Sequence, residues 1–169
     1  MTGRSVQHRL SWTPRATAVD VLARLQRRLP DARDLAAAPY HHPFAGFIFG
    51  SPGGPGSLHV IVDQVGGRAF LTDPWESEVG LSEHSATAHS TIRDPRPRIT
   101  DEAAAEAARQ LVGAVLQRRH RLGLPGPIEL RDGPVLLAKP NWWVTGSRRA
   151  RRVEIIVDAM TGRHYTVTA

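Results

Sequence analysis

The 169-residue chain contains no cysteine, and this absence excludes several kinds of site. Without thiols there is no disulfide framework, no cysteine-ligated zinc and no thiol nucleophile. Lysine is nearly absent too, because Lys139 is the single lysine among 22 basic residues. No apolar run approaches the roughly 18 residues of a membrane-spanning helix, and residues 1–12 lack the apolar centre of a signal peptide. We therefore expect a cytoplasmic protein without a membrane span.

Familiar catalytic motifs are also missing. No nucleophile elbow, phosphate-binding loop or pair of catalytic carboxylates occurs at its usual spacing. The glycine-rich segment 51–57 lacks the Lys-Ser/Thr end of a phosphate loop. The histidines show no metal-binding pattern either; His84 and His89, for example, are five residues apart in an expected loop. The sequence therefore predicts no catalytic residues, no metal and no cofactor.

One short pattern does occur twice. Each copy has a run of β-forming residues, an Asp, a turn that ends in Gly-Arg, and then an aromatic residue. The two copies are His59–Thr72 and Val153–Val167. Asp63 and Asp158 can hydrogen-bond the turn backbone, and Gly67 and Gly162 can adopt the left-handed conformation that the turn needs. We interpret both copies as scaffold turns between paired strands rather than as sites.

An amphipathic helix is expected before each copy. Thr13-Pro14 suits a helix start, and apolar side chains then recur at helical spacing until the next proline. Thr100 suits the cap of a second helix, with acidic residues near its start and arginines near its end. Alanines in the apolar stripe of this second helix predict a close approach to the element that it crosses.

Several shorter segments complete the prediction. The further expected strands are 44–49, 128–131, 134–138 and 142–145. Asp132-Gly133 indicates a tight turn, so 128–138 is expected to be a hairpin. Residues 31–43 are expected to be a loop, and 146–152 a basic turn. Trp75 is expected to pin a polar linker to the body of the protein.

The fold that follows is α+β, with two similar units, each an amphipathic helix packed on an antiparallel β-meander. The predicted boundaries are a flexible leader at 1–12, a first unit at 13–73, a linker at 74–99 and a second unit at 100–169. One copy of about 70 residues cannot close a sizeable core alone, whereas two packed copies can.

These residues resemble a known family. A helix followed by strands that end in VEIIVDAMTGRHYTV is similar to the PepSY-type module, a small cystatin-like α+β unit, and HVIVDQVGGRAFLTD matches the same pattern. The resemblance implies a binding, inhibitory or assembly module rather than an enzyme.

Aromatic residues supply two candidate recognition surfaces. One is the proline-flanked PYHHPF segment, which either binds a partner or docks its own loop onto the body. The other is the Trp142-Trp143 pair, where neighbours in a strand point to opposite faces and one ring should face outward. The predicted partner-binding residues are Tyr40, His41, His42, Phe44, Trp142 and Trp143.

Arginines supply a third surface. The predicted anion-binding residues are Arg118, Arg119, Arg121, Arg148, Arg149, Arg151 and Arg152. They contribute to a net charge of +6 and a pI near 11.1. A genome that favours arginine codons can produce part of this basicity, and a solvated hairpin tip and helix end would carry the same residues.

The function we expect is non-catalytic binding or assembly, as an adaptor or regulatory protein that recognises a protein partner or a second copy of itself. One alternative is binding of nucleic acid or another anionic surface through the Arg-rich hairpin. The other is a small ligand-binding protein or enzyme that uses the Tyr40–His42 loop and His59 inside a concavity.

Overall fold

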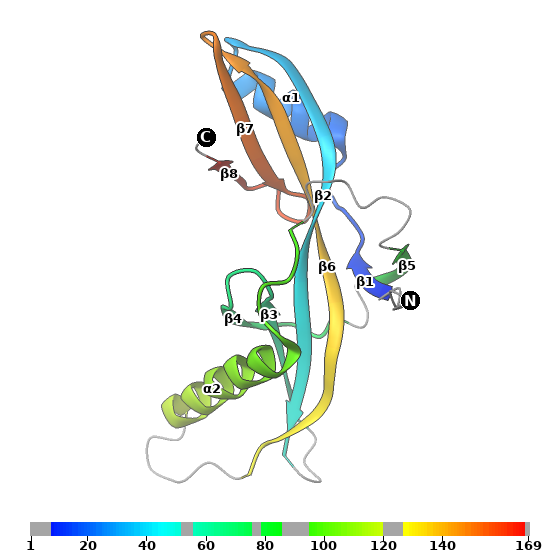
Figure 1. Ribbon diagram of the computed structural model, residues 1–169, viewed down its shortest axis with the longest axis vertical. Helices are drawn as coiled ribbons and strands as arrows, with labels where there is room; N and C mark the ends of the chain where they lie inside the picture. Colours follow the sequence, from blue (N-terminus) through cyan, green and yellow to red (C-terminus); the bar gives the residue numbers. More distant parts are fainter. Residues whose placement is uncertain (1–7, 52–55, 76–78, 86–94, 120–126, 168–169) are drawn as a thin grey trace, which may run out of the picture. The chain divides into compact units, whose positions relative to one another are not determined.

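The computed structural model describes residues 8–51, 56–75, 79–85, 95–119 and 127–167 (Figure 1). In chain order the elements are β1 (His8–Trp12), α1 (Ala18–Arg28), β2 (Ala32–Gly50), β3 (Ser57–Asp63), β4 (Ala69–Thr72), β5 (Val79–Ser85), α2 (Asp101–Arg119), β6 (Glu129–Arg148), β7 (Arg151–Asp158) and β8 (His164–Val167). The described residues thus form an α+β fold, as the sequence predicted. No helix among them is long and apolar enough to cross a membrane.

The strands form one hydrogen-bonded sheet with the order β4-β3-β2-β6-β1-β5, in which β7 pairs with β6 and β8 pairs with β7. The β2–β3, β3–β4, β6–β7 and β7–β8 pairs are antiparallel. The β1–β6 pair is parallel, with Leu10 opposite Leu137. Two antiparallel meanders, β2-β3-β4 and β6-β7-β8, therefore make up most of the sheet.

Residue contacts divide the chain into two compact units. Unit 1 comprises Met1–Ser11, Pro43–His89 and Pro95–Ala138, and unit 2 comprises Trp12–His42, Ser90–Asp94 and Lys139–Ala169. The division falls inside β2 and β6, so each of these long strands supplies residues to both units. The predicted division into 13–73 and 100–169 differs from this one, because the units are not consecutive in the chain.

The two helices are exchanged relative to the predicted arrangement. The sequence predicted that each helix packs on the strands that follow it. Instead, α2 belongs to unit 1 with β3 and β4, and α1 belongs to unit 2 with β7 and β8. Helix α2 therefore covers the meander that follows α1 in the chain, and α1 covers the meander that follows α2.

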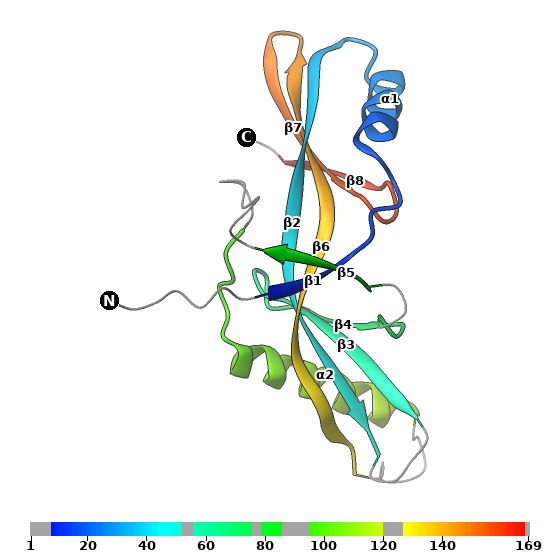
Figure 2. The same cartoon turned by 90° about the vertical axis from the view of Figure 1, so that its right-hand side faces the viewer.

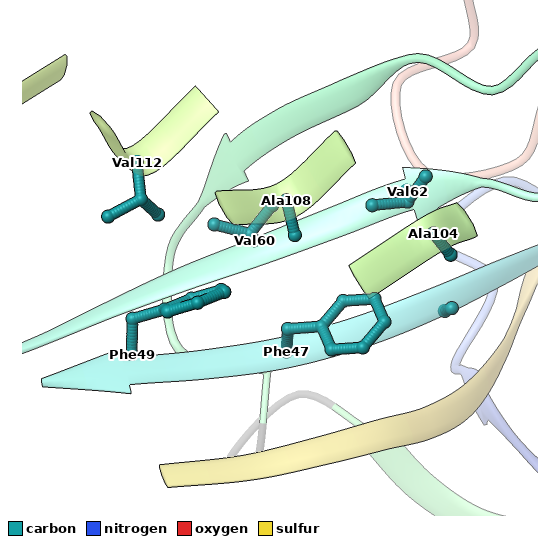
Figure 3. Close-up of a cluster of buried hydrophobic side chains, with 8 residues drawn as sticks. Phe47, Phe49, Val60, Val62, Ala104, Ala108 and Val112 are labelled. Carbon is teal, nitrogen blue, oxygen red and sulfur yellow. The ribbon is translucent and has the colours of Figure 1, made fainter. Parts of the chain in front are cut away.

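Unit 1 has its core between α2 and the strands β2 and β3. Aromatic side chains of β2 and valines of β3 point toward small residues of α2 (Figure 3). The buried members are Ala45, Phe47, Phe49, Val60, Val62, Ala104, Ala108 and Val112. Residues two apart on a strand share a face, and residues four apart on a helix share a stripe, so the sequence pattern builds this core directly. The predicted close approach of the alanines is confirmed.

Unit 2 has a second core beneath α1. Val21 and Leu25, four residues apart on the helix, pack on Val144 of β6 and on Ile155 and Val157 of β7. Figure 2 shows α1 beside the strands on which these residues lie. This core holds α1 and its arginines against one side of the meander.

Both helices begin at side-chain caps. The Thr100 Oγ1 atom accepts a hydrogen bond of 3.2 Å from the Ala103 N–H, which confirms the predicted start of α2. For α1 the predicted cap at Thr13 was wrong. Thr17 caps the helix instead: its Oγ1 accepts from the Asp20 N–H, and the Asp20 carboxylate accepts from the Thr17 N–H, each at 3.2 Å. This reciprocal pair is a capping box, which satisfies two backbone donors at once.

The two predicted scaffold turns have the same hydrogen bonds. The Gly67 N–H donates to the Asp63 carbonyl and the Gly162 N–H to the Asp158 carbonyl, both at 2.8 Å. The glycines have φ values of 73° and 70°, in the left-handed region. Each Asp carboxylate accepts a backbone N–H two residues on, also at 2.8 Å. The mechanical interpretation of these turns is confirmed.

Four segments differ from the prediction. Residues 8–12, predicted as leader, form β1, and Trp12 in it is buried. The predicted loop 31–43 is the first half of β2. The predicted linker 74–99 contains β5, although Trp75 is buried against the His59 ring as expected, with the ring centroids 4.8 Å apart.

The fourth difference lies at Asp132-Gly133, where no hairpin forms and β6 continues. A Cβ atom on Gly133 would lie 2.7 Å from the Gly46 carbonyl oxygen and 2.9 Å from the Phe47 ring. The glycine at this position therefore permits the close approach of β6 to β2. A tight turn also requires glycine, which is why the sequence pattern resembled a hairpin.

Candidate partner-binding surface

The chain's excess positive charge lies in one unit. Unit 2 contains twelve Arg and Lys residues against six Asp and Glu residues, whereas unit 1 contains ten of each. The net charge of +6 therefore belongs wholly to unit 2. Unit 2 has two more basic residues than unit 1 and four fewer acidic ones, so the number of arginines alone does not produce this division.

The β6–β7 hairpin presents the first group of arginines. Arg149 and Ala150 have φ values of 49° and 63°, and Arg148 pairs with Arg151 across the strands. Two central residues with positive φ make a two-residue turn whose twist matches the strands. The predicted basic turn is confirmed, and it is shorter than the expected 146–152.

Carboxylates partly neutralise this hairpin tip. The Asp31 carboxylate, which follows α1, accepts from Arg148 Nε at 2.8 Å and from Arg149 Nε at 3.2 Å. The hydrogen bond from Arg148 lowers the pKa of Asp31 despite some burial. Arg152 pairs with Glu154 at 2.6 Å. Within the described part of the chain Arg151 is exposed and forms no ion pair.

Helix α1 presents a second group. Arg24, Arg27 and Arg28 are exposed, and none of them forms an ion pair with a described residue. Arg24 and Arg28 are four residues apart, so they lie on the same face. These arginines were not among the predicted anion-binding residues. The signal that could have revealed them is the four-residue spacing of Arg24 and Arg28, which places two cations on one face of the helix.

A small cavity lies between α1 and the β7–β8 hairpin, and we call it the α1 notch. Its volume is about 50 Å³, and its lining includes Arg24, Leu25 and Arg28 of α1 together with Val157, Gly162 and His164. Arg28 Nη1 lies 3.5 Å from His164 Nδ1. The notch thus combines two guanidinium groups and an imidazole with apolar walls.

The tryptophan pair is less exposed than predicted. The Trp142 indole N–H donates to the Ala16 carbonyl at 2.8 Å, and its ring packs against the core of unit 2. The Trp143 ring centroid lies 5.5 Å from that of Tyr40. Both indoles are partly buried, so neither ring is fully exposed to solvent. Trp142 packs in the core beneath α1, and Trp143 packs against Tyr40 of β2.

The PYHHPF segment is likewise packed rather than displayed. It is part of β2 and not a loop, and Tyr40 and Phe44 are 7% and 8% exposed. His41 and His42 are partly buried. Tyr40, His41 and His42 belong to unit 2 while Phe44 belongs to unit 1. Of the two interpretations that the sequence left open, docking of the segment onto the body is the one that fits these exposures.

The remaining predicted residues lie in unit 1. Arg118 and Arg119 are exposed at the end of α2, and Arg121 lies outside the described residues. Arg119 borders an open hollow of about 400 Å³ that His59 and Asp73 also line. The two predicted arginine clusters therefore belong to different units, and only 148–152 lies in the unit with excess charge.

No group of three or more His, Asp or Glu side chains in the described ranges is placed to hold a metal ion. The resemblance to PepSY-type modules stays a prediction. Comparison with known protein families, with curated proteins and with solved structures finds no match.

Proposed function

We propose that this is a non-catalytic binding protein that recognises an acidic surface on a protein partner through unit 2. The observation that carries the proposal is the confinement of the whole net charge of +6 to this unit. Arg24, Arg27 and Arg28 of α1 are exposed and form no ion pair with a described carboxylate, and the same is true of Arg151 at the hairpin tip. A one-sided positive field accelerates association with a negatively charged partner and rejects positively charged ones.

A protein partner fits this surface better than a nucleic acid. Single-strand binding uses aromatic rings on which bases stack. Among the unit 2 side chains whose burial the structure describes, the rings of Trp12, Tyr40, Trp142 and Trp143 are buried or partly buried against the protein itself. Two of the hairpin arginines share Asp31, and a third pairs with Glu154, so these guanidinium groups are already oriented by carboxylates. Carboxylates of a partner can join such an arrangement by the same kind of bond.

The charge division also argues against self-association through the unit 2 surface. Two copies of a patch with net charge +6 repel each other, and unit 1, with equal numbers of acidic and basic residues, offers no net opposite charge. The partner we propose is therefore a different, acidic protein.

We further propose that the two halves of the chain are copies of one unit that resembles the PepSY-type module. The matching hydrogen bonds at Asp63 and Asp158 support this, as does the order helix, strand, strand, strand in each half. In this proposal the copies diverged in charge, and the second meander with the first helix became the recognition surface.

The binding proposal is tested with purified protein and two anionic probes of equal charge, polyglutamate and oligothymidylate, by fluorescence anisotropy. We expect the wild-type protein to bind polyglutamate more tightly, with an affinity that falls as salt is raised. Changing Arg24, Arg28 and Arg151 together to Gln should abolish most of this binding.

The matched control changes three exposed unit 1 arginines to Gln, namely Arg109, Arg118 and Arg119. This control removes the same charge and should retain polyglutamate binding. Equal losses in both triple variants, or tighter binding of oligothymidylate, would contradict the proposal. Cross-linking in extracts of the source cells, after nuclease treatment, would then identify the acidic partner by its loss in the unit 2 variant alone.

A further inference from the structure

The α1 notch has the composition of an anion-binding site. Arg24 and Arg28 point their charges to the same side of α1, and like charges four residues apart destabilise a helix slightly. Neither forms an ion pair with a described carboxylate. A side-chain contact joins Arg28 to the His164 ring, at 3.5 Å. No described carboxylate lines the notch, although Asp20, one turn before Arg24 in α1, attracts the Arg24 guanidinium.

The turn backbone makes room for one of these guanidinium groups. A Cβ atom on Gly162 would overlap Arg24 Nη1. The glycine of the scaffold turn therefore lets Arg24 lie against the turn, beside the position of Arg28. The equivalent glycine of the first turn, Gly67, has only an Ile99 methyl group at 4.0 Å in that place.

The walls of the notch are apolar and fixed. Val21, Leu25 and Val157 line it, and each is at most 4% exposed. They belong to the core of unit 2, so the cavity cannot collapse without disturbing that core. Charge-assisted hydrogen bonds beside such walls are stronger than in open water.

The size of the notch limits what it can hold. Its volume is about 50 Å³. A single water molecule needs roughly 10–15 Å³ measured in this way. The space therefore suits a group of about four non-hydrogen atoms, such as a carboxylate with its adjoining methylene, and is too small for a nucleobase.

We infer that the α1 notch is the anchor point for one carboxylate side chain, Asp or Glu, of the acidic partner. This inference rests on the proposed function and specifies its central contact. The carboxylate lies between the two guanidinium groups and accepts from both, because their planar forks match carboxylate geometry, and its methylene packs against Leu25 and Val157.

The test measures polyglutamate binding to three variants with an identical charge change: Arg24→Gln, Arg28→Gln and Arg27→Gln. Arg27 is exposed on the same helix but does not line the notch. We expect Arg24→Gln and Arg28→Gln each to weaken binding about tenfold, the size expected for loss of a hydrogen bond to a charged group. Arg27→Gln should weaken it less than about twofold, as expected for a screened surface charge.

Two further arms separate the possible outcomes. Arg28→Lys keeps the charge but loses the fork, and it should recover only part of the affinity. Arginine side-chain NMR signals of Arg24 and Arg28, but not of Arg27, should shift when polyglutamate is added. Competition with inorganic phosphate shows whether the site accepts any small anion; a competitor that displaces polyglutamate at equal concentration would overturn carboxylate selectivity.

The binding data distinguish an error in the proposed role of the α1 notch from an error in the proposed function of unit 2. If all three Gln variants lose affinity equally, recognition by unit 2 stands and the notch is wrong. If the wild-type protein does not bind polyglutamate at low salt, both are wrong. If Arg24→Gln and Arg28→Gln weaken oligothymidylate binding but not polyglutamate binding, the notch binds phosphate and the inference is overturned.

Discussion

Lys139 and Asp158 form an ion pair in which the Nζ and Oδ2 atoms are 2.8 Å apart and the carboxylate side chain is only 4% exposed. The same carboxylate accepts from the backbone N–H of Met160 through its other oxygen, at 2.8 Å. The only lysine of the chain therefore compensates a buried charge at one of the two scaffold turns. The strand residue and the turn residue are 19 positions apart, so neither local pattern reveals the pair.

Removal of Lys139 should destabilise the protein through this buried carboxylate. In Lys139→Met the methylenes stay and the charge is lost, which leaves Asp158 without its cation. We expect a loss of about 1–3 kcal/mol in the free energy of unfolding, the usual cost of an unsatisfied buried group. Urea unfolding followed by circular dichroism measures it. Arg109→Met is the control, because Arg109 pairs with Glu106 at an exposed position and should cost less than about 0.5 kcal/mol. Equal losses of unfolding free energy in the two variants would mean that the Lys139–Asp158 pair stabilises the protein no more than an exposed ion pair does.

The same pair predicts a dependence on pH. Burial raises the pKa of Asp158, but the hydrogen bonds from Lys139 and from the turn backbone outweigh it, so the folded-state pKa lies below its ordinary value. The unfolded value is about 3.9. The pair therefore stabilises the protein fully above about pH 4–5, and this contribution is lost as the pH falls through the folded-state pKa. The stability difference between wild type and Lys139→Met should shrink between pH 6 and pH 3. A difference that stays constant over this range would contradict the assignment.

The scaffold turns show which features local sequence can predict. Asp63 and Gly67 are held by hydrogen bonds that span four residues, and the same is true of Asp158 and Gly162. Because these hydrogen bonds join residues within one turn, the local pattern is enough to predict the turn geometry. The cap at Thr100 and the alanine stripe of α2 were predictable for the same reason.

Features that depend on distant strands were not predictable. Residues 32–42 contain Pro39 and a run of alanines, which resemble a loop, and they become a strand because β6 lies beside them. The exchange of the two helices is a further example. Each helix has an apolar stripe, but no residue within either helix predicts which meander it packs on.

The candidate site divides in the same way. The arginines at 148–152 were recognisable because they are consecutive and flank a turn. The α1 notch was not, because Arg28 and His164 are 136 positions apart. The aromatic residues misled for a related reason: Trp142 looked exposed only while its acceptor, the carbonyl of Ala16, was unknown.

Substitution of Gly67 tests the backbone requirement of the scaffold turn. Its φ is 73°, and a Cβ atom would meet nothing closer than 4.0 Å, so the cost of Gly67→Ala comes from the backbone alone. We expect a loss of about 1–2 kcal/mol. Gly67→Asn should recover part of it, since Asn tolerates this conformation. Thermal unfolding monitored by circular dichroism compares the variants.

Gly113 offers the opposite control in helix α2. A Cβ atom there meets nothing within 4 Å, so Gly113→Ala should stabilise the protein by about 0.5–1 kcal/mol through helix propensity. A stabilising Gly67→Ala would show that the left-handed conformation at the turn is not required.

The close approach of α2 to the sheet can be tested at Ala108. This residue is fully buried and faces Phe47 and Val60 (Figure 3). Leucine in its place has no room, and overpacking of this kind costs about 1–3 kcal/mol. Ala103→Leu on the exposed side of the same helix is the control and should change stability by less than about 0.5 kcal/mol. Similar values for both variants in urea unfolding would mean that the helix sits further from the sheet.

Asp31 limits the binding strength of the hairpin tip. Its carboxylate holds Arg148 and Arg149 at 2.8 Å and 3.2 Å, and both guanidinium groups become available when it is replaced. We therefore expect Asp31→Asn to strengthen polyglutamate binding by roughly threefold, the size expected of exposed charges. Fluorescence anisotropy at low salt measures the change, and the gain should fade as salt is raised.

The matched control for Asp31→Asn is Glu106→Gln in unit 1. It removes one carboxylate that pairs with an exposed arginine, Arg109, and so raises the net charge of the chain by the same amount. If affinity follows the local surface of unit 2, this variant should bind polyglutamate like the wild type. If both variants gain equally, the whole molecule's charge attracts the probe and the hairpin has no special part. If Asp31→Asn instead weakens binding, Asp31 orients Arg148 and Arg149 toward the partner, and its ion pairs belong to the recognition surface itself.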